Sequence, residues 1–111
     1  MRKNRSDAIE APEEATDFIR VEFKGFLRSL AKVSRKKVKA HNSMMLKDLC
    51  SLLCEELGEE FGRALLGTEL QDPRVNSLIL VNGQEVSVLK GLETSIKAGD
   101  KVTFIPVSHG G

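Results

Sequence analysis

One stretch of this chain repeats apolar residues at the spacing of an α-helix, and it constrains the fold more than any other feature. Residues 44–57 are apolar on one side, and their charged residues fall mostly on the other. Asn42 or Ser43 is suited to cap the start of this predicted helix, and Gly58 is suited to end it. An amphipathic helix of this kind covers an apolar surface. Its apolar stripe consists of Leu46, Leu49, Cys50, Leu53 and Leu57.

Two strands are predicted ahead of that helix, and they provide part of the surface it covers. Residues 18–26 alternate apolar and polar side chains, which is typical of a half-buried strand. Residues 36–41 predict a second, shorter strand, and residues 25–35 between the two are expected to form a loop. The two strands would then make a hairpin. The side chains expected to face inward are Ile19, Val21, Phe23, Val38 and Ala40.

The C-terminal half adds a short helical piece at 59–67 and three further strands, one of them short. The apolar run 78–81 predicts a central strand, and Asn82-Gly83 is the strongest signal for a two-residue hairpin turn. Residues 101–107 predict the last strand. In it, Val102 and Phe104 share one face, and the other face carries Thr103, Ile105 and Val107.

The order of these elements is strand, strand, helix, strand, short strand, strand. This order predicts an α+β domain in which one helix crosses a mostly antiparallel sheet. The domain is expected to span residues 18–107. Residues 1–17 are expected to form a flexible tail with a basic cluster followed by an acidic one, and residues 108–111 a second tail.

The charge balance argues against a dedicated nucleic-acid binder. Seventeen Lys and Arg residues face sixteen Asp and Glu residues, which leaves a net charge of +1. A basic stripe is interpreted as a solvated strand edge, because no aromatic side chains interleave with it to stack on bases. No apolar run approaches the roughly 20 residues that span a bilayer, so we expect a cytoplasmic protein without membrane contact. The stripe contains Arg35, Lys36, Lys37 and Lys39.

Cys50 and Cys54 are four residues apart, which is the spacing of neither a zinc ribbon nor a Cys-x-x-Cys redox pair. On a helix both thiols would lie on one side among leucines. We interpret them as small buried apolar residues. No metal site and no catalytic residue is predicted.

The C-terminal Gly110-Gly111 pair is the feature that carries chemistry. Glycine has no Cβ, so the carboxyl group of Gly111 is sterically open, and Gly110 lets the backbone pass through a narrow tunnel. A carboxylate becomes a good electrophile once it is adenylated, and a sulfur nucleophile can then displace AMP. The chain has neither a phosphate-binding loop nor a dinucleotide turn motif. Nucleotide and catalysis must therefore come from a partner.

From the Leu78 strand to the terminus, the sequence resembles the C-terminal half of the β-grasp sulfur carriers and modifiers. This superfamily includes the small subunit of molybdopterin synthase, the thiamine sulfur carrier, the ubiquitin-related modifiers and the small archaeal modifier proteins. The resemblance covers roughly residues 18–111 and implies a ubiquitin-like β-grasp fold, with a mixed four- to five-stranded sheet packed on one main helix. The matching features are Val81-Asn82-Gly83, Gly91-Leu92, Gly99-Asp100, the strand through Phe104 and Gly110-Gly111.

The resemblance implies that an activating enzyme uses ATP and magnesium to adenylate Gly111, after which sulfur is loaded. The chain itself would be a carrier with no cofactor of its own rather than an enzyme. Three outlets stay open: conjugation to target lysines, sulfur delivery to tRNA, and sulfur delivery inside a molybdopterin-synthase-type large subunit. The His-Gly-Gly ending and the long N-terminal tail favour the modifier role. A plain β-grasp interaction domain with an incidental Gly-Gly is the alternative of another class.

The last strand also predicts where a partner docks, since it delivers the tail. Ile105 and Val107 point away from Phe104 and could form an exposed apolar patch with Phe26. His109 could position or buffer the terminal carboxylate. The predicted docking residues are thus Ile105, Val107, Phe26 and His109.

Overall fold

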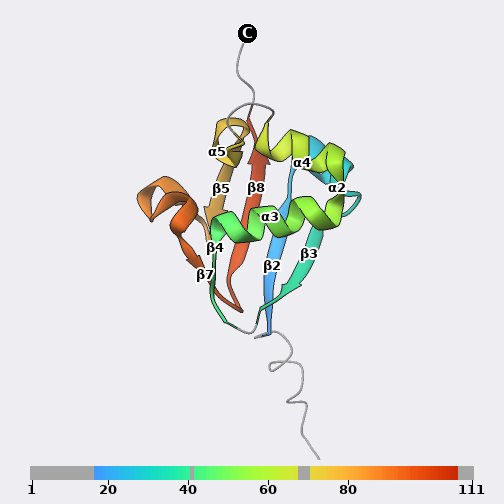
Figure 1. The fold of residues 1–111 in the computed structure, drawn as a ribbon. Coiled ribbons are helices and arrows are strands. Elements are labelled where there is room, and N and C mark those ends of the chain that lie inside the picture. Colours follow the sequence, from blue (N-terminus) through green and yellow to red (C-terminus); the bar gives the residue numbers. More distant parts are fainter. Residues whose placement is uncertain (1–16, 41, 68–70, 108–111) are drawn as a thin grey trace, which may run out of the picture.

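The computed structural model describes residues 17–40, 42–67 and 71–107. Its main feature is a five-stranded sheet with the order β3-β2-β8-β5-β6. The helices α3 and α4 lie over one face of this sheet (Figure 1). The strands are β2 (Phe18–Phe23), β3 (Arg35–Lys39), β5 (Ser77–Val81), β6 (Gln84–Glu85) and β8 (Lys101–Pro106).

The remaining elements connect the strands and cover one face. They are α2 (Gly25–Ala31), β4 (Met44–Met45), α3 (Leu46–Leu57), α4 (Glu59–Leu66), α5 (Pro73–Asn76), η1 (Val86–Val88), η2 (Gly91–Glu93) and β7 (Ser95–Ile96). Of these, the short strands β4 and β7 pair with each other in a small second sheet.

The sheet is mixed, because its two central strands run parallel. β2 and β8 pair in parallel with Val21 opposite Val102 and Phe23 opposite Phe104, while the β3–β2, β8–β5 and β5–β6 pairs are antiparallel. The mixed ubiquitin-like β-grasp sheet is confirmed. The sheet is mostly antiparallel, as expected, and β2–β8 is its parallel pair. Periodicity could not identify that pair, because strand direction depends on a partner some eighty residues away.

The core lies between the sheet and helices α3 and α4. Leu46, Leu49 and Leu53 of α3 are fully buried, as the helical stripe predicts. Phe23 of β2 is at the centre of an aromatic cluster. Its ring contacts Phe61 of α4 edge-on at 5.3 Å between centroids and stacks on Phe104 at 6.0 Å. Aromatic pairs of this kind contribute about 0.5–1.5 kcal/mol each beyond their buried area.

The predicted hairpin turn at Asn82-Gly83 is confirmed. Val81 pairs with Gln84, and the two turn residues have φ values of 51° and 86°. Positive φ at both central positions is the geometry for which Asn-Gly is favoured. The Asn82 side chain also ties this turn to β8, because it donates to Asp100 Oδ1 at 3.0 Å and accepts from the Lys101 N–H at 2.9 Å.

The prediction of a loop at residues 25–35 is wrong. The strand ends at Phe23, and the next residues form helix α2, whose Leu27 and Ala31 are buried one turn apart. A helix of seven residues gives only two inward positions, which is too few to establish a period from sequence. The predicted strand at 36–41 is shifted as well, to Arg35–Lys39.

The predicted cap at Asn42 or Ser43 is also wrong. Helix α3 begins after Met45, which makes no side-chain cap hydrogen bond. The Leu46 N–H instead donates to the Thr94 carbonyl at 2.9 Å. A backbone group from a distant segment thus satisfies one of the helix's free N–H groups, which removes the need for a capping side chain. Gly58 does end the helix, with φ of 101°.

The face of the sheet away from α3 carries an ion cluster centred on Glu22. Its carboxylate lies 3.1 Å from Lys101 Nζ, 3.3 Å from Lys24 Nζ and 4.0 Å from Arg35 Nε. The hydrogen bond from Lys101, and then that from Lys24, lowers the pKa of Glu22 below its ordinary value. Cations on both sides of β2 thus share one carboxylate.

We expect this cluster to make stability depend on pH at the acid end. Because the folded pKa of Glu22 is lowered, its contribution is present above the unfolded pKa of about 4.3 and is lost as pH falls through the folded pKa. Glu22→Gln should therefore lower the urea midpoint at pH 7, and the difference from the native chain should shrink at low pH. The control is Glu55→Gln on the exposed side of α3. A difference that persists unchanged at low pH would contradict the prediction.

Candidate functional site

Gly110, Gly111 and His109 lie outside the described residues, and the described part of the candidate site is the base of the C-terminal segment. The structure describes the chain as far as Val107. That residue leaves β8, which is the central strand of the five. On one side β8 pairs with β2, and on the other with β5, where Ile105 is opposite Leu78 and Pro106 is opposite Ser77.

A backbone hydrogen bond fixes the last described residue. The Val107 N–H donates to the Asn76 carbonyl at 3.0 Å, at the end of α5. Residues 108–111 are the four that follow. Four residues span at most roughly 14 Å when fully extended. An enzyme that acts on the Gly111 carboxylate must therefore approach the end of the sheet where β8 finishes (Figure 1).

The predicted docking residues are found partly where expected. Phe26 is 54% exposed and Val107 39% exposed, while Ile105 is half-buried. Gly25 and Pro106 are in close contact, since a Cβ placed on Gly25 would lie 2.9 Å from Pro106 Cγ. Phe26 and Val107 each adjoin this contact, so both lie at the end of the sheet where β8 finishes. Their role in docking stays a prediction.

Two leucines that the sequence reading did not assign to this surface join Ile105. Leu78 and Leu80 of β5 face away from α3, whereas Ser77, Ile79 and Val81 face inward and are buried. Leu78 is opposite Ile105 in the register. The run Leu78–Val81 suggests a strand buried on both faces, so the outward leucines could be recognised only from the pairing. We call Leu78, Leu80 and Ile105 the apolar strip.

The basic stripe is divided between the two faces of the sheet. Arg35, Lys37 and Lys39 are exposed on the face away from α3, as a solvated strand edge predicts. Lys36 points the other way and forms an ion pair with Glu56 of α3 at 2.9 Å. The period of a strand sends neighbouring residues to opposite sides.

The chain's two thiols are unsuited to act as nucleophiles at neutral pH. Burial raises the pKa of Cys50 to about 12, and burial also raises the pKa of the half-buried Cys54. Cys50 belongs to the core, as predicted, and Cys54 packs partly against it. A Cβ on Gly62 of α4 would lie 3.4 Å from Cys54 Cβ, so the absence of a side chain on Gly62 lets α4 lie close to Cys54 of α3. Sulfur chemistry is therefore not expected on these side chains.

In the part of the chain that the structure describes, no group of three or more His, Cys, Asp and Glu residues is placed to hold a metal ion. Among those same residues, no helix is long and apolar enough to cross a bilayer.

Gly25 should be required for the contact that positions the end of β8. Its φ is +54°, which costs an L-residue about 1–2 kcal/mol, and a Cβ would also meet Pro106. Gly25→Ala should therefore lower the free energy of unfolding by more than that backbone cost and shift the Val107 amide resonance. The control is Gly83→Ala, since Gly83 has φ of +86° but nothing within 4 Å of its Cβ position. Equal losses of stability in urea denaturation would show that the Pro106 contact does not matter.

Comparison with known proteins agrees with this geometry. The family model for the ubiquitin-related modifier matches residues 18–111, which includes the terminal glycine pair. A ubiquitin-related modifier homolog from Caenorhabditis elegans is 26% identical over 95 residues, covering 84% of this chain and 95% of the relative. A protein from Archaeoglobus fulgidus, described as a candidate sulfur carrier, is 31% identical over 68 residues, covering 61% of this chain and 75% of its own length.

The fold gives the same result. The solution structure of the ubiquitin-related modifier from Trypanosoma brucei superposes with a TM-score of 0.72 at 30% identity, covering 86% of this chain and 96% of that one. The family match, the mixed sheet and the central position of β8 agree with one another. This chain belongs to the ubiquitin-related modifier family, within the ubiquitin-like β-grasp sulfur carriers and modifiers.

Proposed function

We propose that this ubiquitin-like modifier and sulfur carrier acts through the carboxyl group of Gly111, which a partner enzyme activates with ATP and magnesium. The carboxylate oxygen attacks the α-phosphorus of ATP and expels pyrophosphate, which leaves an acyl adenylate. A sulfur nucleophile then displaces AMP to give a thiocarboxylate or a thioester. The chain contributes a sterically open carboxyl group and a fixed base, while the partner contributes the catalytic groups.

One observation carries this proposal. The family match runs through Gly111, and the strand that leads to it is the central strand of the sheet. A central strand is hydrogen-bonded along both edges. It therefore fixes the base of the C-terminal segment in place while a partner enzyme acts on Gly111. Gly110 and Gly111 lie three and four residues beyond Val107, so the reactive carboxyl group stays close to this fixed base.

Two outlets follow for the activated Gly111. In the first, the sulfur passes to an acceptor such as a tRNA or the cofactor precursor of a molybdopterin-synthase-type large subunit. In the second, a lysine amine attacks the activated carbonyl carbon and displaces the sulfur, which forms an isopeptide bond. The resemblance to modifiers favours the second outlet, and the relative described as a sulfur carrier supports the first. The cytoplasmic location expected from the sequence stays a prediction.

Deletion of Gly111 should abolish both outlets without unfolding the domain. The experiment compares the native chain, the deletion variant and a Gly110→Val variant, each isolated from the protein's own cells and measured by intact-mass spectrometry. We expect sulfur in place of one carboxylate oxygen of Gly111 in the native chain, and none in either variant. Because Lys101 is the last basic residue, trypsin leaves residues 102–111 attached to a modified lysine. That branched peptide is the signature of conjugation.

The control for this experiment is Ser51→Ala, on the exposed side of α3. It should leave both signatures at the native level. Sulfur loading or conjugation that persists in the Gly111 deletion would overturn the proposal and favour the plain interaction domain. Circular dichroism of each variant separates a loss of chemistry from a loss of fold.

The apolar strip is the surface that we propose to dock on the activating enzyme. Ile105→Glu should lower the fraction of chains with a modified Gly111 at least tenfold, because docking would then bury an unpaired carboxylate where it buries the exposed part of an apolar side chain. Ser51→Glu introduces the same charge on the helical side and should have little effect. Equal effects of the two variants would show that the added charge, and not the strip, is responsible.

A further inference from the structure

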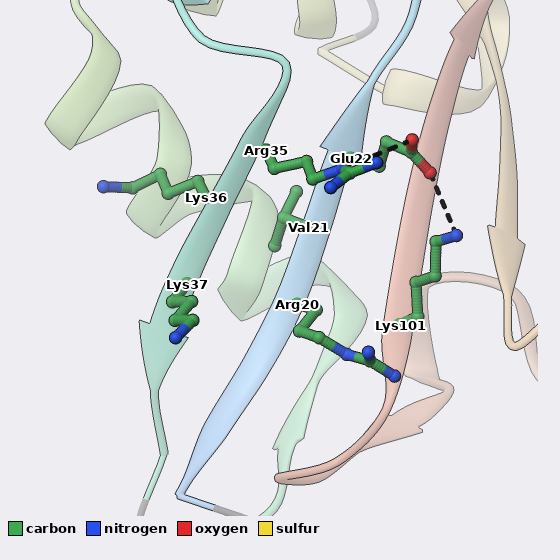
Figure 2. A pocket seen from close by; sticks show the side chains of 7 residues that line it. All are labelled: Arg20, Val21, Glu22, Arg35, Lys36, Lys37 and Lys101. Atoms are coloured by element: carbon green, nitrogen blue, oxygen red, sulfur yellow. Dashed lines mark ion pairs between the residues drawn. The ribbon is translucent and has the colours of Figure 1, made fainter. Parts of the chain in front are cut away.

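The face of the sheet that carries the apolar strip also carries a shallow basic groove. It has a volume of about 530 Å³ and lies over β2, β3 and β8 (Figure 2). Figure 2 shows Arg20, Arg35, Lys37 and Lys101 on this face, with Lys36 turned toward its edge. Among the described residues that line the groove, the acidic side chain is Glu22.

Three cations of the groove lie side by side across three strands. Arg20 of β2 is directly opposite Lys37 of β3 on one side and directly opposite Lys101 of β8 on the other. With neighbouring strands about 4.8 Å apart, this cation row is roughly 10 Å long. Like charges directly opposite each other on a sheet are destabilising. The row therefore favours an anion that lies across it.

The acidic residue at the row does not balance it. Glu22 pairs with Lys101, Lys24 and Arg35, so one negative charge is shared among three cations. Lys37 also lies over the ring of Phe18, with Nζ 5.5 Å from the ring centroid. This contact holds the ammonium group above the sheet, at the end of β2 where the chain enters.

The sequence just ahead of β2 has the complementary charge. Residues 7–17 contain five acidic residues and no lysine or arginine. We call this stretch the acidic segment. It joins the domain at Asp17, whose carbonyl accepts a hydrogen bond from the Ala40 N–H at 3.1 Å. The acidic residues are Asp7, Glu10, Glu13, Glu14 and Asp17.

The tether keeps this segment within reach of the row. Asp17 is three residues from Arg20, and residues 10–17 could reach about 25 Å if extended, which exceeds the length of the row. A short tether gives an effective concentration in the millimolar range without any free ligand. We propose that the acidic segment binds the cation row of its own domain and covers the basic groove.

Occupation of the row would affect the neighbouring apolar strip. Lys101 and Ile105 point to the same side of β8, so a segment bound to the row and a partner docked on the strip would occupy one face of the sheet. This consequence, unlike the binding itself, rests on the proposed function. The test below concerns the binding alone.

The test uses two full-length variants with equal changes of charge. In the first, Glu10, Glu13 and Glu14 become Gln; in the control, the exposed Glu55, Glu60 and Glu93 become Gln. Amide resonances of Arg20, Lys37 and Lys101 are compared by NMR at about 0.01 M and about 1 M NaCl, between which the Debye length falls from roughly 30 Å to roughly 3 Å. Glu→Gln keeps the size of the side chain, and the three control positions are exposed, so both variants should fold.

We expect the first variant to shift these three resonances at low salt, in the direction that salt shifts them in the native chain. The difference between the first variant and the native chain should fall at least twofold at high salt. In an Arg20→Gln/Lys37→Gln background, neutralising the acidic segment should no longer move the Lys101 resonance. Such loss of coupling identifies the row as the binding site.

Two results would overturn the proposal. One is equal shifts in the first variant and the control, which would mean that only net charge matters. The other combines two observations. The amide resonances of the cation row stay unchanged in the first variant, and the same resonances shift saturably when a short single-stranded RNA is added to the native chain. That outcome would make the groove a nucleic-acid contact instead.

Discussion

The parallel pairing of β2 with β8 is the interaction on which the rest of this structure depends. It places the first and last described strands side by side at the centre of the sheet. Parallel neighbours cannot be joined by a tight turn, so the intervening chain must cross over, and α3 does so across one face. Because the two strands run in the same direction, the chain enters the sheet at one end and leaves it at the other (Figure 1).

This arrangement gives the face away from α3 two halves of different chemistry. Near the end where the chain enters, the three strands present Arg20, Lys37 and Lys101. Toward the end where it leaves, β5 and β8 present Leu78 and Ile105. A surface that is cationic at one end and apolar at the other can orient a partner, since charge acts at longer range than apolar contact. The aromatic cluster around Phe23 on the opposite face holds these strands in register.

The candidate site is the end of a strand and not a cavity with catalytic groups. Cys50 and Cys54 are kept neutral by burial, and the proposed reaction needs no side chain of this domain to act as acid or base. What the fold supplies is position: the central strand, the Asn76 carbonyl and the Gly25–Pro106 contact fix Val107. The roughly 14 Å beyond Val107 then limit how far a partner's active site can lie from the sheet.

The sequence by itself determined the features that are local in the chain. The stripe from Leu46 to Leu57, the alternation around Val21, the turn at Asn82-Gly83 and the terminal glycines follow from residue type and spacing over a few positions. Only the tertiary structure decided features that depend on a distant partner. It set the parallel β2–β8 register, the Thr94 carbonyl that receives the Leu46 N–H, and the outward side of Leu78. Periodicity gives the two faces of an element but not the neighbour that each face meets, because that choice depends on packing across the whole domain.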